Sequence, residues 1–502
     1  MSPAKVRRVC ISVTLVILLL GMSASISMDS GERKELPAEE GKIETYPNSN
    51  NHPGFQDGSI YTATSLTAST DHTCVILHDQ SMKCWGNSAQ GFLGNGYFWT
   101  EFWTPQEVNL GEQGGANTAT ETSSFGHHSC TIMTDNAVKC WGEAGHGQLG
   151  HGVHDGWHSD PFLAVMGNVT PIEMAAGYHH TCSIYDNYNL YCWGDNMWGQ
   201  VGNNGSLGGA NEDVGYPTLI PLPQNRTAVA VNLGGNSGCA ILDNGSGMCW
   251  GLNDQGQLGD GTLTDRNVPT PLTVIPSNRT LAALAVGVDN SCGLLDNGSV
   301  YCWGNNSFGQ FGDGTSSNSS IVATSGSYTS LPPGRTAISI DMGKEHACAI
   351  LDDSSAVCWG NNSYGQLGDN TTNYSHSPIA VNGNHSFQAI STGYFHTCGI
   401  ITNGSVYCWG HSAGGRLGLG VEVDSDEPAW VDLEGTSSSS TTHAFLGDRD
   451  PDGDGILSIF DSTPYPPPVC TVGNYLVGYE CVDASPGHYV ANNGSTEQTP
   501  CA

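Results

Sequence analysis

Basic side chains are scarce in this sequence: lysine and arginine together number 15 among 502 residues, against 48 aspartates and glutamates. A nucleic-acid-binding protein needs a basic surface to neutralise phosphates, so the net charge of −33 predicts no nucleic acid among the partners. Charged residues make up only 13%, whereas glycine occurs 67 times. This composition does not suit long helices and favours many short strands joined by turns.

Long apolar runs are also missing, with one exception near the N-terminus. Three basic residues precede the apolar stretch 11–20, and small residues follow it, which is the pattern of a secretion signal. We therefore predict a signal peptide over 1–25, a disordered linker over 26–57, and a secreted or cell-surface protein. The alternatives are an uncleaved signal anchor and a lipid anchor, although Cys10 precedes the apolar stretch and is badly placed to carry a lipid. We expect no membrane span beyond this segment.

Catalytic motifs are absent from the sequence as well. It contains no nucleophile elbow, no zinc-protease motif and no phosphate-binding loop. Acidic residues are so numerous that no single pair of carboxylates indicates glycoside chemistry. We therefore predict that the protein is not an enzyme.

Most of the 18 cysteines belong to an internal repeat, in which a cysteine is followed by nine residues and then by Cys-Trp-Gly. The repeat occurs seven times, and successive copies begin 50 to 57 residues apart. A period near 50 is typical of a β-propeller with one sheet per repeat. We therefore predict an all-β fold, a seven-bladed propeller over residues 58–434. The paired cysteines are Cys74 with Cys84, Cys130 with Cys140, Cys182 with Cys192, Cys239 with Cys249, Cys292 with Cys302, Cys348 with Cys358, and Cys398 with Cys408.

The spacing within each pair fits a disulfide across a β-hairpin. In the fifth repeat, the Asp-Asn-Gly sequence at 296–298 suits a three-residue hairpin loop. Counting outward from it places Cys292 opposite Cys302 at a non-hydrogen-bonded pair, where Cα atoms lie about 4.5 Å apart. That separation is within the disulfide range, and export favours oxidation. Zinc is the alternative, but this spacing is unlike that of zinc ligands.

A glycine-rich segment follows each Cys-Trp-Gly, for example Gly-Gln-Leu-Gly-Asp-Gly at 256–261. Because it recurs along the chain, it is a structural turn and not a phosphate-binding loop. With the preceding His-Thr-Cys and Asn-Gly-Ser-Val-Tyr-Cys-Trp-Gly elements, it resembles the repeat of the regulator of chromosome condensation family, in an exported, disulfide-rich form. The resemblance implies a seven-bladed propeller with four-stranded blades, and the cysteine spacing adds one disulfide to each blade.

The resembled family contains exchange factors for small GTPases, enzyme inhibitors and interaction modules, so the fold alone does not select a function. Its nuclear members lack both the signal peptide and the cysteine pair. Export and acidity argue against a nuclear exchange factor that binds chromatin.

A histidine lies two residues before the first cysteine in five repeats, and Ser237 and Asn290 replace it in the other two. A ring of histidines around a channel would bind a metal or respond to pH. We favour a structural role, hydrogen bonding to the backbone between strands, because the replacements interrupt a ligand set. The five histidines are His72, His128, His180, His346 and His396.

Two segments are candidates for partner binding. The loop after the second cysteine pair is rich in histidine, with Asp155 and Asp160 nearby; such donors suit zinc or copper, but we prefer a polar loop that contacts a partner. Residues 97–103 are rich in aromatic side chains, which fit either a binding surface or a buried junction between the first blade and its neighbour. The candidate residues are Trp99, Trp103, His151, His154, Trp157 and His158, with His146 beside them.

After a Ser/Thr linker over 435–447, residues 448–468 contain an aspartate-rich loop and a proline-rich spacer. The loop has the ligand spacing of a twelve-residue calcium site and resembles the calcium-binding repeats of thrombospondin type 3. We expect calcium as a cofactor; an acidic, solvated turn is the alternative. The ligands would be Asp450, Asp452, Asp454, Ile456, Ser458 and Asp461.

The last segment, 469–502, contains Cys470, Cys481 and Cys501 and resembles the start of a cysteine-rich module of the growth-factor or ephrin-receptor type. Taken together, the sequence predicts a non-catalytic binding or adhesion propeller outside the cell that presents its loop faces to a protein or glycan partner. The alternatives are an exchange-factor-like regulator of a small GTPase, as the resemblance implies, and a secreted enzyme with a site on one propeller face.

Overall fold

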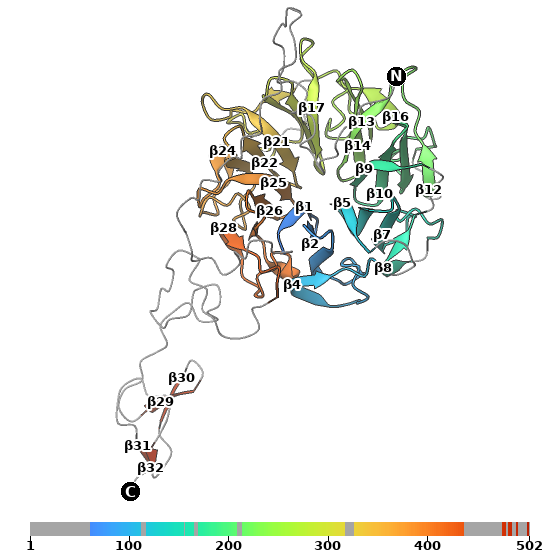
Figure 1. The fold of residues 1–502 in the computed structure, drawn as a ribbon. Helices are drawn as coiled ribbons and strands as arrows, with labels where there is room; N and C mark the ends of the chain where they lie inside the picture. Colours follow the sequence, from blue (N-terminus) through green and yellow to red (C-terminus); the bar gives the residue numbers. More distant parts are fainter. Residues whose placement is uncertain are drawn as a thin grey trace, which may run out of the picture. The chain divides into compact units, whose positions relative to one another are not determined.

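The computed structural model describes residues 61–111, 117–154, 156–164, 169–207, 213–316 and 326–435, and four short strands between residues 474 and 500. The chain divides into two compact units, Met1–Gly435 and Thr436–Ala502. The first unit contains seven antiparallel four-stranded sheets around one axis (Figure 1). The predicted all-β, seven-bladed propeller with four-stranded blades is therefore confirmed. The signal segment, the linker 26–57 and the expected calcium ligands lie outside the described residues.

Each blade takes its four strands from one repeat, in sequence order. The first three blades are β1 (Ala63–Ala68), β2 (His72–Leu77), β3 (Met82–Asn87) and β4 (Glu101–Glu107); β5 (Ala119–Ser124), β6 (His128–Met133), β7 (Val138–Glu143) and β8 (Trp157–Leu163); and β9 (Pro171–Ala176), β10 (His180–Tyr185), β11 (Leu190–Gly194) and β12 (Val214–Leu219). The first strand of each blade is innermost and contacts the first strands of its two neighbours.

The remaining four blades follow the same plan. They are β13 (Ala228–Leu233), β14 (Ser237–Leu242), β15 (Gly247–Gly251) and β16 (Arg266–Pro271); β17 (Leu281–Val286), β18 (Asn290–Leu295), β19 (Val300–Gly304) and β20 (Ser327–Tyr328); β21 (Ala337–Met342), β22 (His346–Leu351), β23 (Ala356–Gly360) and β24 (Ser375–Ala380); and β25 (Phe387–Thr392), β26 (His396–Ile401), β27 (Val406–Gly410) and β28 (Ser425–Trp430). In the second unit, β29 (Asn474–Val477) pairs with β30 (Glu480–Asp483), and β31 (His488–Tyr489) with β32 (Thr499–Pro500).

The cysteine pairs lie inside the blades, as predicted. In every blade the two cysteines are directly opposed on the second and third strands, as Cys292 and Cys302 are on β18 and β19. All seven pairs are disulfides, with Cα–Cα separations of 4.0 to 4.1 Å. Each bridge therefore fixes the register of the two middle strands of its blade. In blade order, the bridges join Cys74 to Cys84, Cys130 to Cys140, Cys182 to Cys192, Cys239 to Cys249, Cys292 to Cys302, Cys348 to Cys358, and Cys398 to Cys408.

The tryptophan of each Cys-Trp-Gly is fully buried between two blades. Its indole Nε1 donates to a main-chain carbonyl in the glycine-rich turn of the preceding blade; Trp409, for example, donates to Gln366 at 3.0 Å. The turn must come very close to the ring, since a Cβ on Gly368 would lie 2.6 Å from the Trp409 Nε1 atom. Gly368 also has a φ of +68°, which glycine adopts without strain. The recurrent glycines are thus explained by contacts between blades.

Connections leave the blades at two opposite faces because the strands are antiparallel. The first-to-second turns and the third-to-fourth loops emerge together, and we call this side the loop face. The second-to-third hairpins and the connections to the next blade emerge on the other side, which we call the hairpin face. The long, variable segments after Cys-Trp-Gly all belong to the loop face.

Candidate functional site

The six candidate partner-binding residues all come from the loop-face side of the first two blades. Trp99 lies in the β3–β4 loop and Trp103 in β4, whereas His151 and His154 lie in the β7–β8 loop, and Trp157 and His158 begin β8.

The aromatic rings of this region are largely open to solvent. Trp99 is 72% exposed, and its ring centroid lies 5.8 Å from that of Trp157, which is 42% exposed. Trp103 lies at the junction with the seventh blade, where the main-chain N–H of Gly420 donates to its carbonyl at 2.7 Å. Trp99 therefore lies on the surface, whereas Trp103 lies at a blade junction but is still 38% exposed, so the interpretation as a buried junction does not hold for it.

Further exposed apolar side chains lie on the loop-face side of the third blade, and the sequence reasoning missed them. Met197, Trp198 and Leu207 belong to the β11–β12 connection, and Tyr216 to β12. The signal that would have found them is the Met-Trp pair in the segment after the third Cys-Trp-Gly. We call the exposed set over blades one to three the aromatic sector; it comprises Tyr97, Phe98, Trp99, Trp103, Trp157, Trp198 and Tyr216.

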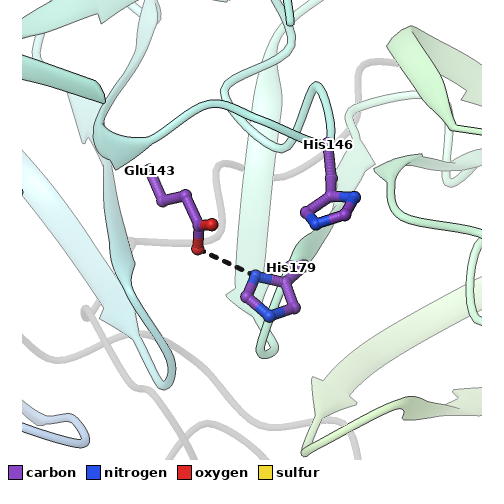
Figure 2. Close-up of side chains that lie close together, drawn as sticks. All are labelled: Glu143, His146 and His179. Carbon is purple, nitrogen blue, oxygen red and sulfur yellow. Dashed lines mark ion pairs between the residues drawn. The ribbon is translucent and has the colours of Figure 1, made fainter. Parts of the chain in front are cut away.

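A cluster of imidazoles and carboxylates lies beside the aromatic sector, between blades two and three (Figure 2). The His179 Nδ1 atom lies 3.0 Å from Glu143 Oε2, and the His146 Nδ1 atom lies 3.1 Å from Asp213 Oδ2. His154 approaches the same Asp213 oxygen at 4.0 Å. We call Glu143, His146, His179 and Asp213 the histidine–carboxylate cluster.

The repeat itself explains why these side chains meet. Glu143 directly follows Cys-Trp-Gly, and its N–H donates to the carbonyl of His127 at 2.9 Å, in the first-to-second turn of its own blade. His179 occupies the position of His127 in the third blade. Side chains at these two positions therefore face their neighbours along the loop face. Of the cluster, only His146 was singled out from the sequence, together with His154, which approaches Asp213.

The other histidines of the loop do not join this cluster. His151 and His158 lie together, with their Nε2 atoms 3.2 Å apart, and both rings contact Phe162. Asp160 accepts a hydrogen bond from Asn109 Nδ2 at 2.9 Å, and Asp155 lies outside the described residues. The structure thus divides the histidine-rich loop into two separate groups.

The electrostatics of the cluster follow from partial burial and close pairing. Burial raises the pKa of Asp213 above its ordinary value, although His146 partly opposes this. Burial also disfavours the charged form of Glu143, but His179, His127 and His146 more than offset it and hold the pKa of this carboxyl below its usual range. Glu143 is therefore a carboxylate at neutral pH, facing an imidazole.

Three aromatic rings meet across the axis near this cluster. Phe125, Tyr178 and Tyr394 come from the first-to-second turns of blades two, three and seven, and their ring centroids lie 5.5 to 6.3 Å apart. Lys344 lies 5.0 Å from the ring centroid of Phe395, beside Tyr394. These rings link blades that are not neighbours in the ring and hold the centre of the loop face together.

The five repeated histidines are structural, but for four of them the predicted backbone partner was wrong. Four donate or accept through Nε2 with a hydroxyl of the next blade, at 2.7 to 2.9 Å, and not with the backbone. His180 faces the position of Gly238, which carries no hydroxyl. Burial is the main cause that lowers the pKa of His72, His128, His180 and His346 to about 3. The hydroxyl pairs are His72–Ser129, His128–Thr181, His346–Thr397 and His396–Thr73.

Among the residues that the structure describes, no helix has the length and apolar character that crossing a membrane requires.

Comparisons with known proteins find the same type of repeat in this chain. The regulator of chromosome condensation (RCC1) repeat matches residues 189–241, 248–294, 297–350 and 357–400, and a second model of the same repeat matches 282–310, 337–366 and 387–416. The human E3 ubiquitin-protein ligase HERC2 is 28% identical over 261 residues, 52% of this chain and 5% of that protein. The ultraviolet-B receptor UVR8 of Arabidopsis thaliana is 26% identical over 308 residues, 61% of this chain and 66% of that receptor. The chain thus spans less than two thirds of either relative.

Solved structures agree on the fold. Prp20p from Saccharomyces cerevisiae has a TM-score of 0.62 at 20% identity, over 75% of this chain and 89% of that one. Human WBSCR16 has a TM-score of 0.62 at 18% identity, over 70% of this chain and 94% of that one. With seven Cys-Trp-Gly repeats, seven blades and these matches, the chain is a seven-bladed propeller that carries repeats of the regulator of chromosome condensation type.

Proposed function

We propose that this chain is a non-catalytic, protein-binding propeller that acts outside the cell and contacts its partner through the aromatic sector. The observation that carries the proposal is the exposed pair Trp99 and Trp157, which join the first two blades on the loop face. Exposed tryptophans on a rigid surface are typical centres of protein interfaces, since each contributes a large contact area with little loss of side-chain entropy.

The scaffold under the aromatic sector supports this role. A disulfide in every blade and a buried tryptophan between blades hold the loops on a rigid ring. A pre-organised surface loses less entropy on binding than a mobile one. The disulfides also support action in an oxidising compartment, in agreement with the secretion signal expected over 1–25.

The similar proteins support binding as the role of the fold. Prp20p, which resembles this chain in fold, binds Gsp1p and histones. We propose a protein partner for this chain too. The partner's own surface should be neutral or basic, because the chain carries a net charge of −33.

The test compares loop-face and hairpin-face variants in capture from the native extracellular milieu. The doubly substituted Trp99→Ala, Trp157→Ala chain should lose at least about tenfold in affinity for the captured partner, since each substitution of a central tryptophan typically costs more than about 1 kcal/mol. Tyr188→Asn is the matched control, because Tyr188 is an exposed aromatic on the β10–β11 hairpin and asparagine tolerates its φ of 60°. Equal loss in both variants, or retention in both, contradicts the proposal. Capture that glycosidase treatment of the milieu abolishes would indicate a glycan partner instead.

A further inference from the structure

We propose that Glu143, His146 and His179 bind a zinc ion that links the second and third blades. One donor atom from each side chain lies within 4.8 Å of the other two. The three side chains turn toward one another from two segments of the loop face, the start of the β7–β8 loop and the β9–β10 turn (Figure 2). This inference concerns a site beside the aromatic sector and does not depend on the proposed partner.

The backbone holds the three donors in place. Glu143 ends β7 and is fixed by its main-chain hydrogen bond to His127, and His146 follows in the same tight loop, where its N–H donates to Gln148 Oε1 at 2.9 Å. His179 precedes β10, and its carbonyl accepts from the N–H of Asp195 at 2.8 Å. Glu143 and His179 therefore lie at or next to the ends of strands that disulfides stiffen, which pre-organises two of the three donors.

Two donor atoms already point at a shared space. Glu143 Oε2 and His179 Nδ1 are shielded from solvent, and neither makes an aligned hydrogen bond within the described part of the chain, although they lie only 3.0 Å apart. Without a proton on Nδ1, the lone pairs of the two atoms would face each other and repel, so this pair needs either a proton or a cation between its members. A cation between the carboxylate and the imidazole would satisfy both atoms at once.

The remaining carboxylate orients the third ligand. Asp213 Oδ2 lies 3.1 Å from His146 Nδ1, so a proton on Nδ1 is held there and the lone pair of the other ring nitrogen is free for a metal. This carboxylate–histidine arrangement is common around protein-bound zinc, where it fixes the tautomer and the ring direction. Asp195, which with His146 and Asp213 forms a second close group, adds negative charge that favours a cation.

The donor set selects the type of ion. Two imidazoles and one carboxylate match zinc, which accepts nitrogen and oxygen ligands in a tetrahedron and often keeps its fourth position open. Calcium and magnesium prefer oxygen ligands only. Donors around a tetrahedral zinc ion with bonds of about 2.0–2.1 Å are closer together than 4.8 Å, so binding requires a small inward movement of the His146 ring. That side chain is 40% exposed and has room to move.

The experiment uses the full chain, stripped of metal with a chelator and then titrated with Zn²⁺ by calorimetry. The wild type should bind a zinc ion that Glu143→Gln and His179→Asn each weaken at least tenfold, and Co²⁺ in its place should give the visible absorption of a tetrahedral site. His411→Asn is the matched control, because His411 pairs with Asp424 at 2.9 Å in the seventh blade and belongs to neither of the close groups of metal donors found among the described residues. This control should bind zinc as the wild type does.

Two outcomes overturn the zinc proposal. One is a wild-type chain that binds no zinc in the titration, and the other is binding that all three variants retain. The Glu143→Gln variant separates loss of zinc binding from a folding defect, since it preserves the shape of a partly exposed side chain and should leave the circular dichroism spectrum unchanged. Zinc should also raise the melting temperature of the wild type and the control but not of the two site variants, because a ligand stabilises only a native state that binds it.

Discussion

The indole Nε1 of Trp85, in the first blade, donates a hydrogen bond of 3.0 Å to the main-chain carbonyl of Arg416, in the last blade. The same type of bond joins the tryptophan of each other Cys-Trp-Gly to the blade before it. Because all four strands of every blade come from one repeat, the ring closes through side-chain contacts and single main-chain hydrogen bonds, such as that from Ala63 N–H to the carbonyl of Gly404 at 2.8 Å, and not through a strand exchanged between its ends. The closing contact is thus an ordinary blade junction made by residues more than 300 positions apart.

Arg416 differs from the residues at its position in the neighbouring repeats. Blades two to six have glutamine there, and the side chain folds back on its own turn, as Gln366 Oε1 does by accepting from the N–H of Tyr364 at 2.9 Å. Arg416 also contacts its own turn, where its Nε donates to the carbonyl of Ala413 at 2.7 Å. Its guanidinium then reaches into the first blade, pairs with Asp71 at 2.9 Å and donates to the carbonyl of Thr70 at 3.1 Å. The last blade therefore carries an additional link to the first.

Replacing this arginine by the usual glutamine should weaken ring closure. We expect Arg416→Gln to lower the free energy of unfolding by about 1–3 kcal/mol, because a largely buried charged hydrogen bond is lost. Urea unfolding measures the change. Arg226→Gln is the control, since Arg226 pairs with Asp243 in an exposed position and should cost less than about 1 kcal/mol. Equal effects of the two variants would show that closure does not depend on Arg416.

The disulfides should each contribute to stability on their own. Substitution of Cys292 and Cys302 by serine opens a short loop in one blade, and chain entropy predicts a loss of about 2–3 kcal/mol in the free energy of unfolding. Mass mapping of unreduced peptides should find each cysteine joined within its own hairpin. Links between blades, or free thiols at most positions, would contradict the structure.

The aspartate-rich segment should respond to calcium. With calcium, the stretch 443–468 should resist limited proteolysis, because the cation relieves the repulsion among the carboxylates. Asp452→Ala should abolish the protection, whereas Asp448→Ala, outside the ligand spacing, should retain it. The same digestion pattern with calcium and with chelator would leave only an acidic turn.

The periodic part of the fold could be predicted from the sequence because its determinants are local. The hairpin loop at 296–298 sets the register that brings Cys292 opposite Cys302, and seven copies of that element set the number of blades. The glycine-rich turns were also recognised as structural. Their reason, close approach to the tryptophan of the next blade, as between Gly368 and Trp409, depends on the packing of neighbouring sheets.

The site could be predicted only in part, because its side chains meet through tertiary structure. Trp99 and Trp157 belong to different repeats, and His179 reaches Glu143 from the next blade. The histidine before each first cysteine was assigned to a backbone bond, since nothing local to it names a hydroxyl more than 50 residues away. The pairing with Thr397 or Ser129 is visible only once the blades are placed side by side.

The buried histidines should make the propeller sensitive to acid. A histidine whose folded pKa is about 3 and whose unfolded pKa is about 6.5 stabilises the fold above pH 6.5, and this contribution is lost as the pH falls toward 3. His180→Asn, which places here the residue that Asn290 provides in the fifth blade, removes one group that takes up a proton on unfolding. The free energy of unfolding should then fall less steeply with decreasing pH, by up to about 1.4 kcal/mol per pH unit. Urea unfolding at a series of pH values from 7 to 4 measures this slope. His78→Asn, on an exposed position, should leave the slope unchanged; an unchanged slope in His180→Asn as well would contradict the assignment.

Two carboxyl groups on the innermost strands should have the opposite effect at higher pH. Glu173 accepts the N–H of Val231 at 2.9 Å, and burial together with the charge of Glu121 raises its pKa to about 8. A raised folded pKa means that stability is complete below the unfolded value near 4.5 and is lost as the pH rises through 8. Glu173→Gln keeps the hydrogen-bond acceptor and removes the titrating group, so above pH 8 its free energy of unfolding should equal or exceed that of the wild type. Between pH 5 and 8 the slope of this free energy with pH should differ from the wild-type slope by up to about 1.4 kcal/mol per pH unit. Glu422→Gln, on the exposed β27–β28 loop, is the control, and a Glu173→Gln chain with the wild-type slope would show that this carboxyl is ionised in the native ring.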